Sequence, residues 1–150
     1  MKVIQVNQTA VRQASKDAKF SDLSVAKILR YLSNKKVRNR SLFKERRELT
    51  VVFLTPAQMK KINFQYRKKN KPTDILSFAA IEPGSLGELL LCPAILKKQA
   101  KDHHHTVEAE TFYMLIHGVL HLLGYDHEAS AAEEKLMFKI QDDCFNALMP

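Results

Sequence analysis

Apolar and polar side chains alternate along Lys2–Asn7, as they do in a strand with one buried face. Three later segments, Leu49–Leu54, Asp74–Ala80 and Gly87–Cys92, are rich in β-branched or apolar residues and also predict strands. Proline and glycine within Glu82–Leu86 predict a turn, so the last two strands are expected to form a hairpin or a close pair. The pattern therefore predicts a sheet of about four strands.

Between these strands, apolar residues recur at the spacing of a helix. Ser21 is predicted to cap a helix that runs to about Val37, and Arg38–Arg46 is typical of a basic connector. The segment Thr55–Tyr66 begins with an N-cap threonine, a proline and a capping-box glutamine, which predict a second helix. A third helix is predicted over Pro93–Lys101, because proline is favoured at the first helical position.

The most apolar helix is predicted over Val107–Leu123, with Thr106 as its N-cap. Its apolar residues lie on most sides, which predicts a buried helix. Ser130 and Glu133 predict a capping box that opens the final helix. The apolar stripe of that helix is expected in the core and consists of Leu136, Met137, Ile140, Cys144 and Leu148. The whole chain, residues 1–150, is predicted to be a single mixed α/β domain with four to five helices.

The segment His117–His127 carries the most specific chemistry of the chain. His117 and His121 are four residues apart, so both side chains lie on one face of the predicted helix. Gly124 is expected to end that helix in the left-handed conformation, and the chain can then bring His127 toward the other two histidines. Three imidazoles around one zinc ion leave a fourth position open, which is typical of catalytic rather than structural zinc.

The residue after the first histidine distinguishes this motif from the common zinc peptidase motif. In His-Glu-x-x-His peptidases that residue is the general base, whereas here it is Gly118. The spacing His-x-x-x-His-x-x-Gly-x-x-His otherwise matches the long form of the peptidase motif. Glycine inside a helix is unfavourable by about 1 kcal/mol relative to alanine, so we expect substrate or neighbouring backbone to approach closely there. The motif predicts a zinc hydrolase that is not a standard peptidase.

Three consecutive histidines, His103, His104 and His105, precede the same helix. Consecutive side chains point in different directions, so we expect no metal role for them. The two cysteines, Cys92 and Cys144, are too few for a disulfide framework and are expected to be reduced and buried. The segment Met1–Asn7 is too short and too quickly polar for a secretory signal, and there is no apolar run of about 18 residues, so we expect a cytoplasmic protein without a membrane span.

Basic residues exceed acidic ones, with 24 Lys plus Arg against 16 Asp plus Glu and a net charge of +8. The excess is concentrated in two segments, Lys35–Arg47 and Lys60–Lys71. Such charge favours a polyanionic partner, although a charge run is often only a solvated surface. Together with a hydrolytic metal site, the two runs indicate a nucleic-acid substrate.

Two segments of this chain resemble the YbeY family. The first is His-Gly-x-Leu-His-Leu-x-Gly-Tyr-Asp-His at His117–His127, and the second is Asn63–Phe78, which contains Pro-Thr-Asp-Ile-Leu-Ser-Phe. The similarity extends in order and spacing from about Thr50 to the C-terminus. The chain departs from the family at Gly87-Glu88-Leu89, where Gly-Asp-Ile is common, and Glu88 retains a carboxylate whose role stays open.

The resemblance implies an α/β fold with one zinc ion per chain, bound by His117, His121 and His127. It implies cleavage of single-stranded RNA, in maturation of the 3′ end of small-subunit ribosomal RNA and in ribosome quality control, with the small ribosomal subunit as a partner. The functional arginine of the family corresponds to Arg67, so Arg67 and His117 are the expected catalytic residues. The basic residues that we expect to hold RNA phosphates are Lys68, Lys69, Lys71, Arg38 and Arg40.

The sequence leaves the nucleophile and the general base open. Either zinc-bound hydroxide or the ribose 2′-OH attacks the phosphate, and Asp126 can orient an imidazole, face solvent or cap a turn. Phe64, Tyr66 and Tyr125 can stack on bases, although packing in the core is the more common use of aromatic residues. Two alternative functions fit the same residues. One is a zinc hydrolase of another class, such as a peptidase with a displaced base, and the other is a non-catalytic ribosome assembly factor with structural zinc.

Overall fold

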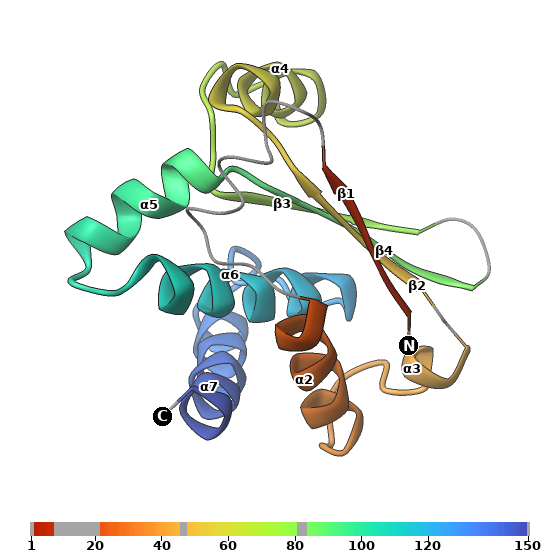
Figure 1. The fold of residues 1–150 in the computed structure, drawn as a ribbon. Coiled ribbons are helices and arrows are strands. Elements are labelled where there is room, and N and C mark those ends of the chain that lie inside the picture. Colours follow the sequence, from red (N-terminus) through yellow and green to blue (C-terminus); the bar gives the residue numbers. More distant parts are fainter. Residues whose placement is uncertain (1, 8–21, 46–47, 81–83, 150) are drawn as a thin grey trace.

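A computed structural model shows how the predicted strands are arranged (Figure 1). It describes residues 2–7, 22–45, 48–80 and 84–149. The four strands form one sheet in the order β1-β2-β4-β3. Their bounds are β1 (Lys2–Asn7), β2 (Glu48–Phe53), β3 (Ile75–Ala79) and β4 (Ser85–Leu91). The strands β1 and β4 run parallel to β2, and β3 runs antiparallel to β4. The expected close pairing of the last two strands is therefore confirmed, while part of the predicted turn between them, residues 82–83, lies outside the described residues.

Six helices accompany the sheet in the part of the chain that the structure describes. They are α2 (Asp22–Ser33), α3 (Leu42–Glu45), α4 (Pro56–Arg67), α5 (Pro93–Asp102), α6 (Val107–Leu122) and α7 (Ala131–Leu148). The additional helix relative to the prediction is α3, a four-residue turn inside the expected basic connector. The mixed α/β fold class is confirmed.

The helix α2 ends at Ser33 and not near Val37 as predicted. The reason is local, because Ser33 Oγ and Asn34 Nδ2 both donate to the carbonyl of Arg30, at 2.8 and 3.0 Å. These side chains satisfy a carbonyl that a continuing helix would have paired. The predicted cap, Ser21, lies outside the described residues.

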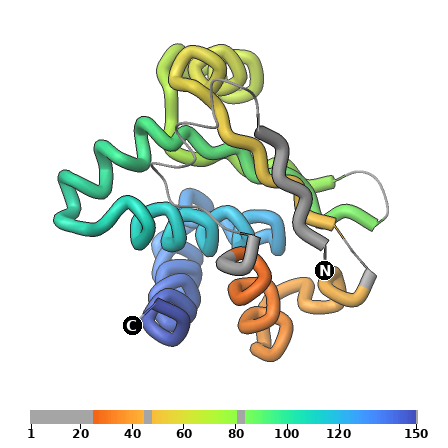
Figure 2. Tube along the Cα trace, in the orientation of Figure 1, coloured from red at the N-terminus to blue at the C-terminus, as the bar shows by residue number. Residues whose placement is uncertain are grey.

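The two faces of the sheet enter two separate cores, because successive side chains of a strand point to opposite faces. Val51 and its partner Leu89 belong to the large core, whereas Val52 and its partner Leu90 contribute to a smaller core that includes Met59 of α4. Figures 1 and 2 show α6 between the sheet and the helices α2 and α7. The helix α4 therefore covers the face of the sheet that is opposite to α6.

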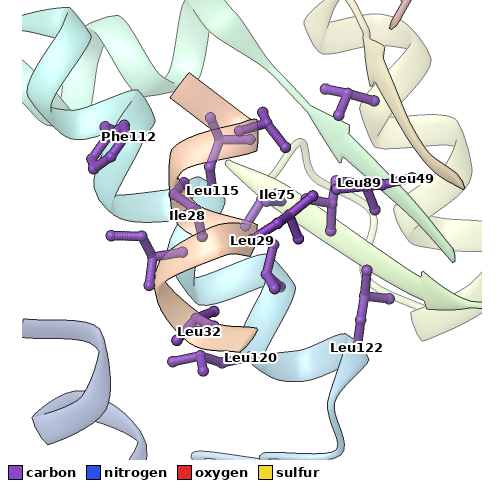
Figure 3. Close-up of a cluster of buried hydrophobic side chains, with 14 of the residues drawn as sticks. Ile28, Leu29, Leu32, Leu49, Ile75, Leu89, Phe112, Leu115, Leu120 and Leu122 are labelled. Carbon is purple, nitrogen blue, oxygen red and sulfur yellow. The ribbon is translucent and has the colours of Figure 1, made fainter. Parts of the chain in front are cut away.

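The buried position predicted for the metal-site helix is confirmed, since ten of its residues are buried. Figure 3 shows side chains of α6 in contact range of those from α2 and from the strands; the labelled ones are Ile28, Leu29, Leu32, Leu49, Ile75, Leu89, Phe112, Leu115, Leu120 and Leu122. Contact on several sides holds α6 in a single orientation. Side chains on α6 therefore start from a rigid support, as a site that must hold its geometry requires.

Two predicted helix caps have different outcomes. At the start of α4 the capping box is complete, because Thr55 Oγ1 accepts from the Gln58 N–H and Gln58 Oε1 accepts from the Thr55 N–H. At the start of α7 only half of the predicted box forms, with Ser130 Oγ accepting from the Glu133 N–H. The Glu133 carboxylate instead binds Arg38, a residue that is distant in sequence.

The core face of α7 also differs from the predicted stripe. Leu136 is 43% exposed, whereas Gln141 is completely buried. The buried residues Met137, Gln141 and Cys144 are spaced by four and three positions, so they form one continuous helical face. A stripe predicted from apolar residues alone therefore includes a leucine that faces solvent, Leu136, and omits an amide that is buried, Gln141.

Cys92 and Cys144 are both buried and free. Among the helices that the structure describes, none combines the length and the apolar character needed to cross a membrane.

Candidate metal centre

The helix α6 places two imidazoles side by side. Nε2 of His121 lies 3.1 Å from Nε2 of His117, and the two ring centroids are 4.6 Å apart. His117 is 8% exposed, so its ring is enclosed by the core on most sides. The spacing of four residues brings the two rings together in the way that the sequence predicts.

His127 reaches the same point through the turn that follows α6. Gly124 has φ +98°, the left-handed conformation expected of it, and the Tyr125 N–H donates to the Leu120 carbonyl at 3.1 Å. The ring centroid of His127 then lies 4.9 Å from that of His117 and 5.1 Å from that of His121. One ligand atom from each ring lies within 4.8 Å of the others. We call His117, His121 and His127 the imidazole triad.

The segment before α3 clamps this turn from outside. The Arg38 N–H donates to the Tyr125 hydroxyl at 2.9 Å, and Asn39 Nδ2 donates to the Leu123 carbonyl at 2.8 Å. The Arg38 guanidinium lies 4.4 Å from the centre of the Tyr125 ring and donates to the Gly124 carbonyl at 3.0 Å. It also forms a two-pronged ion pair with Glu133 of α7.

This clamp gives Arg38 a structural role. Its guanidinium donates to the Gly124 carbonyl and to the Glu133 carboxylate, and these contacts hold the turn that carries His127. The ion pair with Glu133 lowers the pKa of that carboxyl, because the hydrogen bonds from Arg38 stabilise its charged form. The Arg38 side chain is still 38% exposed, so the RNA-binding role expected of it stays a prediction.

Gln141 of α7 orients the first imidazole of the triad. Gln141 Nε2 donates to the Tyr113 carbonyl at 3.1 Å, so its Oε1 is the acceptor that faces Nδ1 of His117, also at 3.1 Å. Nδ1 of His117 must then carry the proton, which leaves the lone pair on Nε2. This is the tautomer in which Nε2 can bind a metal ion, and a fixed partner for the other nitrogen is typical of metal-bound histidine.

The surroundings favour the neutral form of two of the rings. Burial lowers the pKa of His117, the hydrogen bond with Gln141 opposes the shift, and repulsion from His121 and His127 adds to it, so that this pKa is about 4. Burial likewise lowers the pKa of His121. Neutral imidazole is the form that binds metal, so these two ligands are prepared for a cation at neutral pH.

A further observation supports the fit of a metal ion. Nδ1 of His127 is buried and has no hydrogen-bond partner within the described part of the chain. A buried polar atom without a partner is unfavourable, and a ring nitrogen beside two other imidazoles is a group that a cation can satisfy. The residues of the triad therefore fit a divalent metal ion.

Gly118 is explained by packing and not by the expected approach of substrate or backbone. A Cβ at this position would lie 2.8 Å from Ile75 Cδ1 and 2.8 Å from Leu89 Cδ2. These side chains belong to β3 and β4, so glycine allows α6 to lie close to the sheet. The position that holds the general base in the peptidase motif is thus used here for contact between α6 and the core.

The triad opens into a cleft of about 710 Å³ that lies between the basic loop after α4 and the helices α6 and α7. Arg67, Lys69 and Lys71 line this cleft together with the triad. Arg67 Nη2 lies 3.8 Å from Glu128 Oε1, a long and solvent-exposed ion pair that leaves most of its donors available. The cleft therefore combines a cation site with three basic side chains, and three carboxylates, Asp74, Asp126 and Glu128, also line it.

The chain is similar to proteins of a known family. The family model described as Endoribonuclease YbeY matches residues 9–149. The chain belongs to the YbeY family. It is 48% identical over 149 residues to the Endoribonuclease YbeY of Bdellovibrio bacteriovorus, covering 99% of this chain and 96% of that protein. It is 33% identical over 150 residues to the Endoribonuclease YbeY of Petrotoga mobilis, again covering 99% and 96%.

The fold has a counterpart among solved structures. The solution structure of a Thermotoga maritima protein superposes with a TM-score of 0.61 at 26% identity, covering 97% of this chain and 88% of that one.

The remaining candidate residues of this chain are distributed unevenly around the cleft. Lys68 caps α4 in the left-handed conformation, and it is exposed but does not line the cleft. Arg40 and Glu88 are also exposed and absent from its lining. Asp126 lines the cleft, but its Oδ1 accepts from the Glu128 N–H at 3.0 Å, so it caps a turn.

The three aromatic residues considered for stacking on bases also differ in their exposure to solvent. Phe64 is 52% exposed and Tyr66 is 62% exposed, which is contrary to the core packing considered more common for such residues. Tyr66 makes an edge contact with Phe78 and leaves the rest of its ring open. Tyr125 is buried under Arg38 and is not available to a base.

Two polar residues with a role at the site were missed by the sequence analysis. Gln141 was not predicted because it interrupts the apolar stripe of α7. A single amide within such a stripe is the signal in the sequence that could have identified it. Asn63 is 1% exposed, lines the cleft and donates from Nδ2 to the Lys71 carbonyl at 2.8 Å, which holds the basic loop against α4. In the sequence, Asn63 is distinguished only by its position in the segment Asn63–Phe78, which resembles the YbeY family.

A second cluster of possible metal ligands lies outside the cleft, contrary to expectation. His103, His105 and Glu110 bring one ligand atom each within 4.8 Å of the others. His104 has φ +57°, so the backbone turns over between the two flanking histidines and directs both toward α6. Two side chains on either side of a left-handed residue can face the same way, although consecutive side chains generally point in different directions. We call His103, His105 and Glu110 the α5–α6 cluster.

Proposed function

We propose that this chain is a zinc-dependent endoribonuclease domain that cleaves single-stranded RNA. The observation that carries the proposal is the imidazole triad at the wall of a cleft that Arg67, Lys69 and Lys71 also line. Among the described residues, no fourth His, Cys, Asp or Glu belongs to this group of ligands. Three imidazoles with an open position are the usual arrangement of catalytic zinc.

His117, His121 and His127 would hold the metal ion. When bound there, zinc supplies Lewis acidity toward a phosphoryl oxygen and lowers the pKa of water. Gln141 keeps the proton of His117 on Nδ1, and the walls of the core limit rotation of that ring. These contacts fix the metal-binding nitrogen before substrate arrives.

Arg67 is the group that we assign to the scissile phosphate. It lies on the last turn of α4 and lines the same cleft as the triad. A guanidinium matches two phosphate oxygens at once, and its positive charge offsets the charge that develops in the transition state. Its ion pair with Glu128 is long and exposed, so a phosphate can replace it at small cost.

Lys69 and Lys71 extend the positive surface along the cleft and are assigned to neighbouring backbone phosphates. Phe64 and Tyr66 lie on the same helix as Arg67 and present exposed rings. Exposed aromatic rings beside basic residues are a common surface for single-stranded nucleic acid, because unpaired bases can stack on them. This surface supports preference for single-stranded over double-stranded RNA.

The biological setting follows from the family. We propose that the RNA is ribosomal, that the reaction matures the 3′ end of small-subunit ribosomal RNA, and that the small ribosomal subunit presents it. A role in ribosome quality control and a cytoplasmic location belong to the same proposal.

The alternatives have less support. A peptidase with a displaced base gains nothing at position 118, where the space is filled by Ile75 and Leu89. A non-catalytic assembly factor would need neither an open position on the metal nor an arginine beside it. The experiment below separates both alternatives from the nuclease.

The test uses a defined single-stranded RNA, the full chain and variants of the basic residues. Arg67→Ala should lower the cleavage rate by roughly 10²–10³-fold, the usual effect of removing one donor to developing charge. Arg67→Lys should recover only part of the rate, because lysine keeps the charge but loses the fork. Lys68→Ala is the matched control and should cleave normally.

Metal content and folding are measured on the same samples. Full cleavage by Arg67→Ala or by chelator-treated protein would contradict the proposal. Analysis of the cleaved ends then decides the nucleophile, because a 2′,3′-cyclic phosphate requires attack by the ribose 2′-OH and a 5′-phosphate requires attack by water.

A further inference from the structure

The turn between α5 and α6 carries three side chains that converge without any part in the cleft. Nδ1 of His103 lies 3.2 Å from Oε1 and 3.3 Å from Oε2 of Glu110, and Nδ1 of His105 lies 3.2 Å from Oε2. We propose that the α5–α6 cluster is a second metal site, which takes a divalent transition metal ion of the zinc, cobalt or nickel type.

The distances suit such an ion. Bonds of about 2.1 Å to a tetrahedral centre place neighbouring ligand atoms about 3.4 Å apart. The nitrogen–oxygen separations of 3.2 Å in the cluster are close to that value, as is the 3.1 Å between the two nitrogens of His117 and His121. An ion therefore enters with small movements of side chains that already face one another.

The backbone holds the histidines in place. The His103 N–H donates to the Gln99 carbonyl at 2.9 Å, and the His105 N–H donates to the Ala100 carbonyl at 2.8 Å. The next residue, Thr106, caps α6 by accepting from the Ala109 N–H at 3.0 Å. Both histidines thus belong to an ordered connection between two helices.

The environment of Glu110 favours a cation. Glu110 is 2% exposed, and a buried carboxylate is unfavourable unless charge or hydrogen bonds compensate it. The side chains of His103 and His105 are 58% and 45% exposed, so an ion can reach the carboxylate from solvent between them. Two imidazoles with one carboxylate favour transition metals over magnesium or calcium, which prefer oxygen ligands.

The two sites are separate. Glu110 and His117 are seven residues apart on α6, which corresponds to about 10 Å along the helix axis. Figure 1 shows the α5–α6 connection at the end of α6 opposite to the end that leads on to α7. An ion in the cluster would join α5 to the metal-site helix without contacting the cleft.

The experiment counts metal ions on the full chain. Protein stripped with chelator is dialysed against Zn²⁺, and bound metal is measured per chain. The parent should bind two equivalents, and His105→Gln should bind one. His104→Asn is the matched control from the same triplet and should bind two, because asparagine tolerates the left-handed conformation of this position. Glu110→Gln, which is nearly isosteric, should also bind one.

The other outcomes overturn the proposal. If the parent binds a single equivalent, the cluster is only a hydrogen-bonded carboxylate. If His104→Asn loses the second equivalent as His105→Gln does, the second ion is held nonspecifically by surface histidines. Because Glu110 is buried, thermal melts of each variant accompany the count, and His105→Gln decides the matter if Glu110→Gln does not fold. Cleavage of RNA by His105→Gln should remain at the parent level, which separates this site from the proposed nuclease centre.

Discussion

The imidazole triad and the α5–α6 cluster both take ligands from α6 but are built in different ways. In the triad, two ligands share one face of α6, and Gln141, itself completely buried, holds the first ring. In the cluster, two exposed histidines from a turn meet one buried carboxylate. The first ring of the triad is buried in the core, whereas the cluster depends on one left-handed residue, His104. Rigid support is the property that a reaction requires, and a simple link between two helices does not need it.

The largest difference between the two sites is expected in RNA cleavage. His121→Ala removes a ligand from the triad and should lower cleavage by about 10³-fold or more, since metal assistance supplies several kcal/mol of transition-state stabilisation. His105→Gln in the cluster should leave the rate unchanged. Rates and bound metal are measured on both variants. Equal losses would show that the two sites do not have separate roles.

The second difference concerns pH. The folded-state pKa of His117, about 4, lies below its ordinary value of 6.5, so the unfolded chain binds the proton more readily. Stability is therefore fully present above pH 6.5 and is lost as the pH falls toward 4. For the metal-free protein we expect the free energy of unfolding to fall by roughly 2 kcal/mol between pH 6.5 and pH 5 from this group.

Denaturant unfolding in the presence of chelator measures this loss. The variant His117→Gln should show a smaller fall over the same interval, and the parent saturated with Zn²⁺ should resist it, because the metal holds the neutral ring. Other groups close to His117 are Asp74, His121 and His127, which are unchanged in that variant. An equal fall in His117→Gln and in the parent would assign the effect to other groups.

A third test addresses the support of the triad. Gln141→Leu removes the acceptor for the His117 Nδ1–H and should weaken zinc binding at the triad by about 10–100-fold, the usual effect of losing such a partner. Gln141→Glu keeps an acceptor oxygen and should retain tighter binding than Gln141→Leu. Competition with a chelating dye measures both affinities. Unchanged affinity in Gln141→Leu would mean that packing alone orients the ring.

The smallest effect is expected at the clamp on the turn. Arg38→Met leaves the triad intact but removes the contacts to Gly124 and Glu133, so zinc affinity should fall by less than about tenfold. Arg40→Met is the matched control and should bind zinc as the parent does. A fall in RNA affinity without any fall in zinc affinity would support the RNA-binding role expected of Arg38.

The sequence alone determined the parts that depend on regular local spacing. His117 and His121 are paired by the period of a helix, Gly124 ends that helix because it tolerates a positive φ, and Thr55 with Gln58 closes a capping box within four residues. The buried character of α6 follows from apolar residues around its whole circumference. These features need no information from distant parts of the chain.

The tertiary structure alone decided where polar side chains find distant partners. Glu133 has a sequence position suited to a capping box, but Arg38 offers its carboxylate a two-pronged charged partner. Gln141 is buried because Nδ1 of His117 and the Tyr113 carbonyl both face it, and His103 meets Glu110 because the backbone turns over at His104. Hydrogen bonds and ion pairs of this kind join residues that are close only after the helices have packed, so no local pattern could have predicted them.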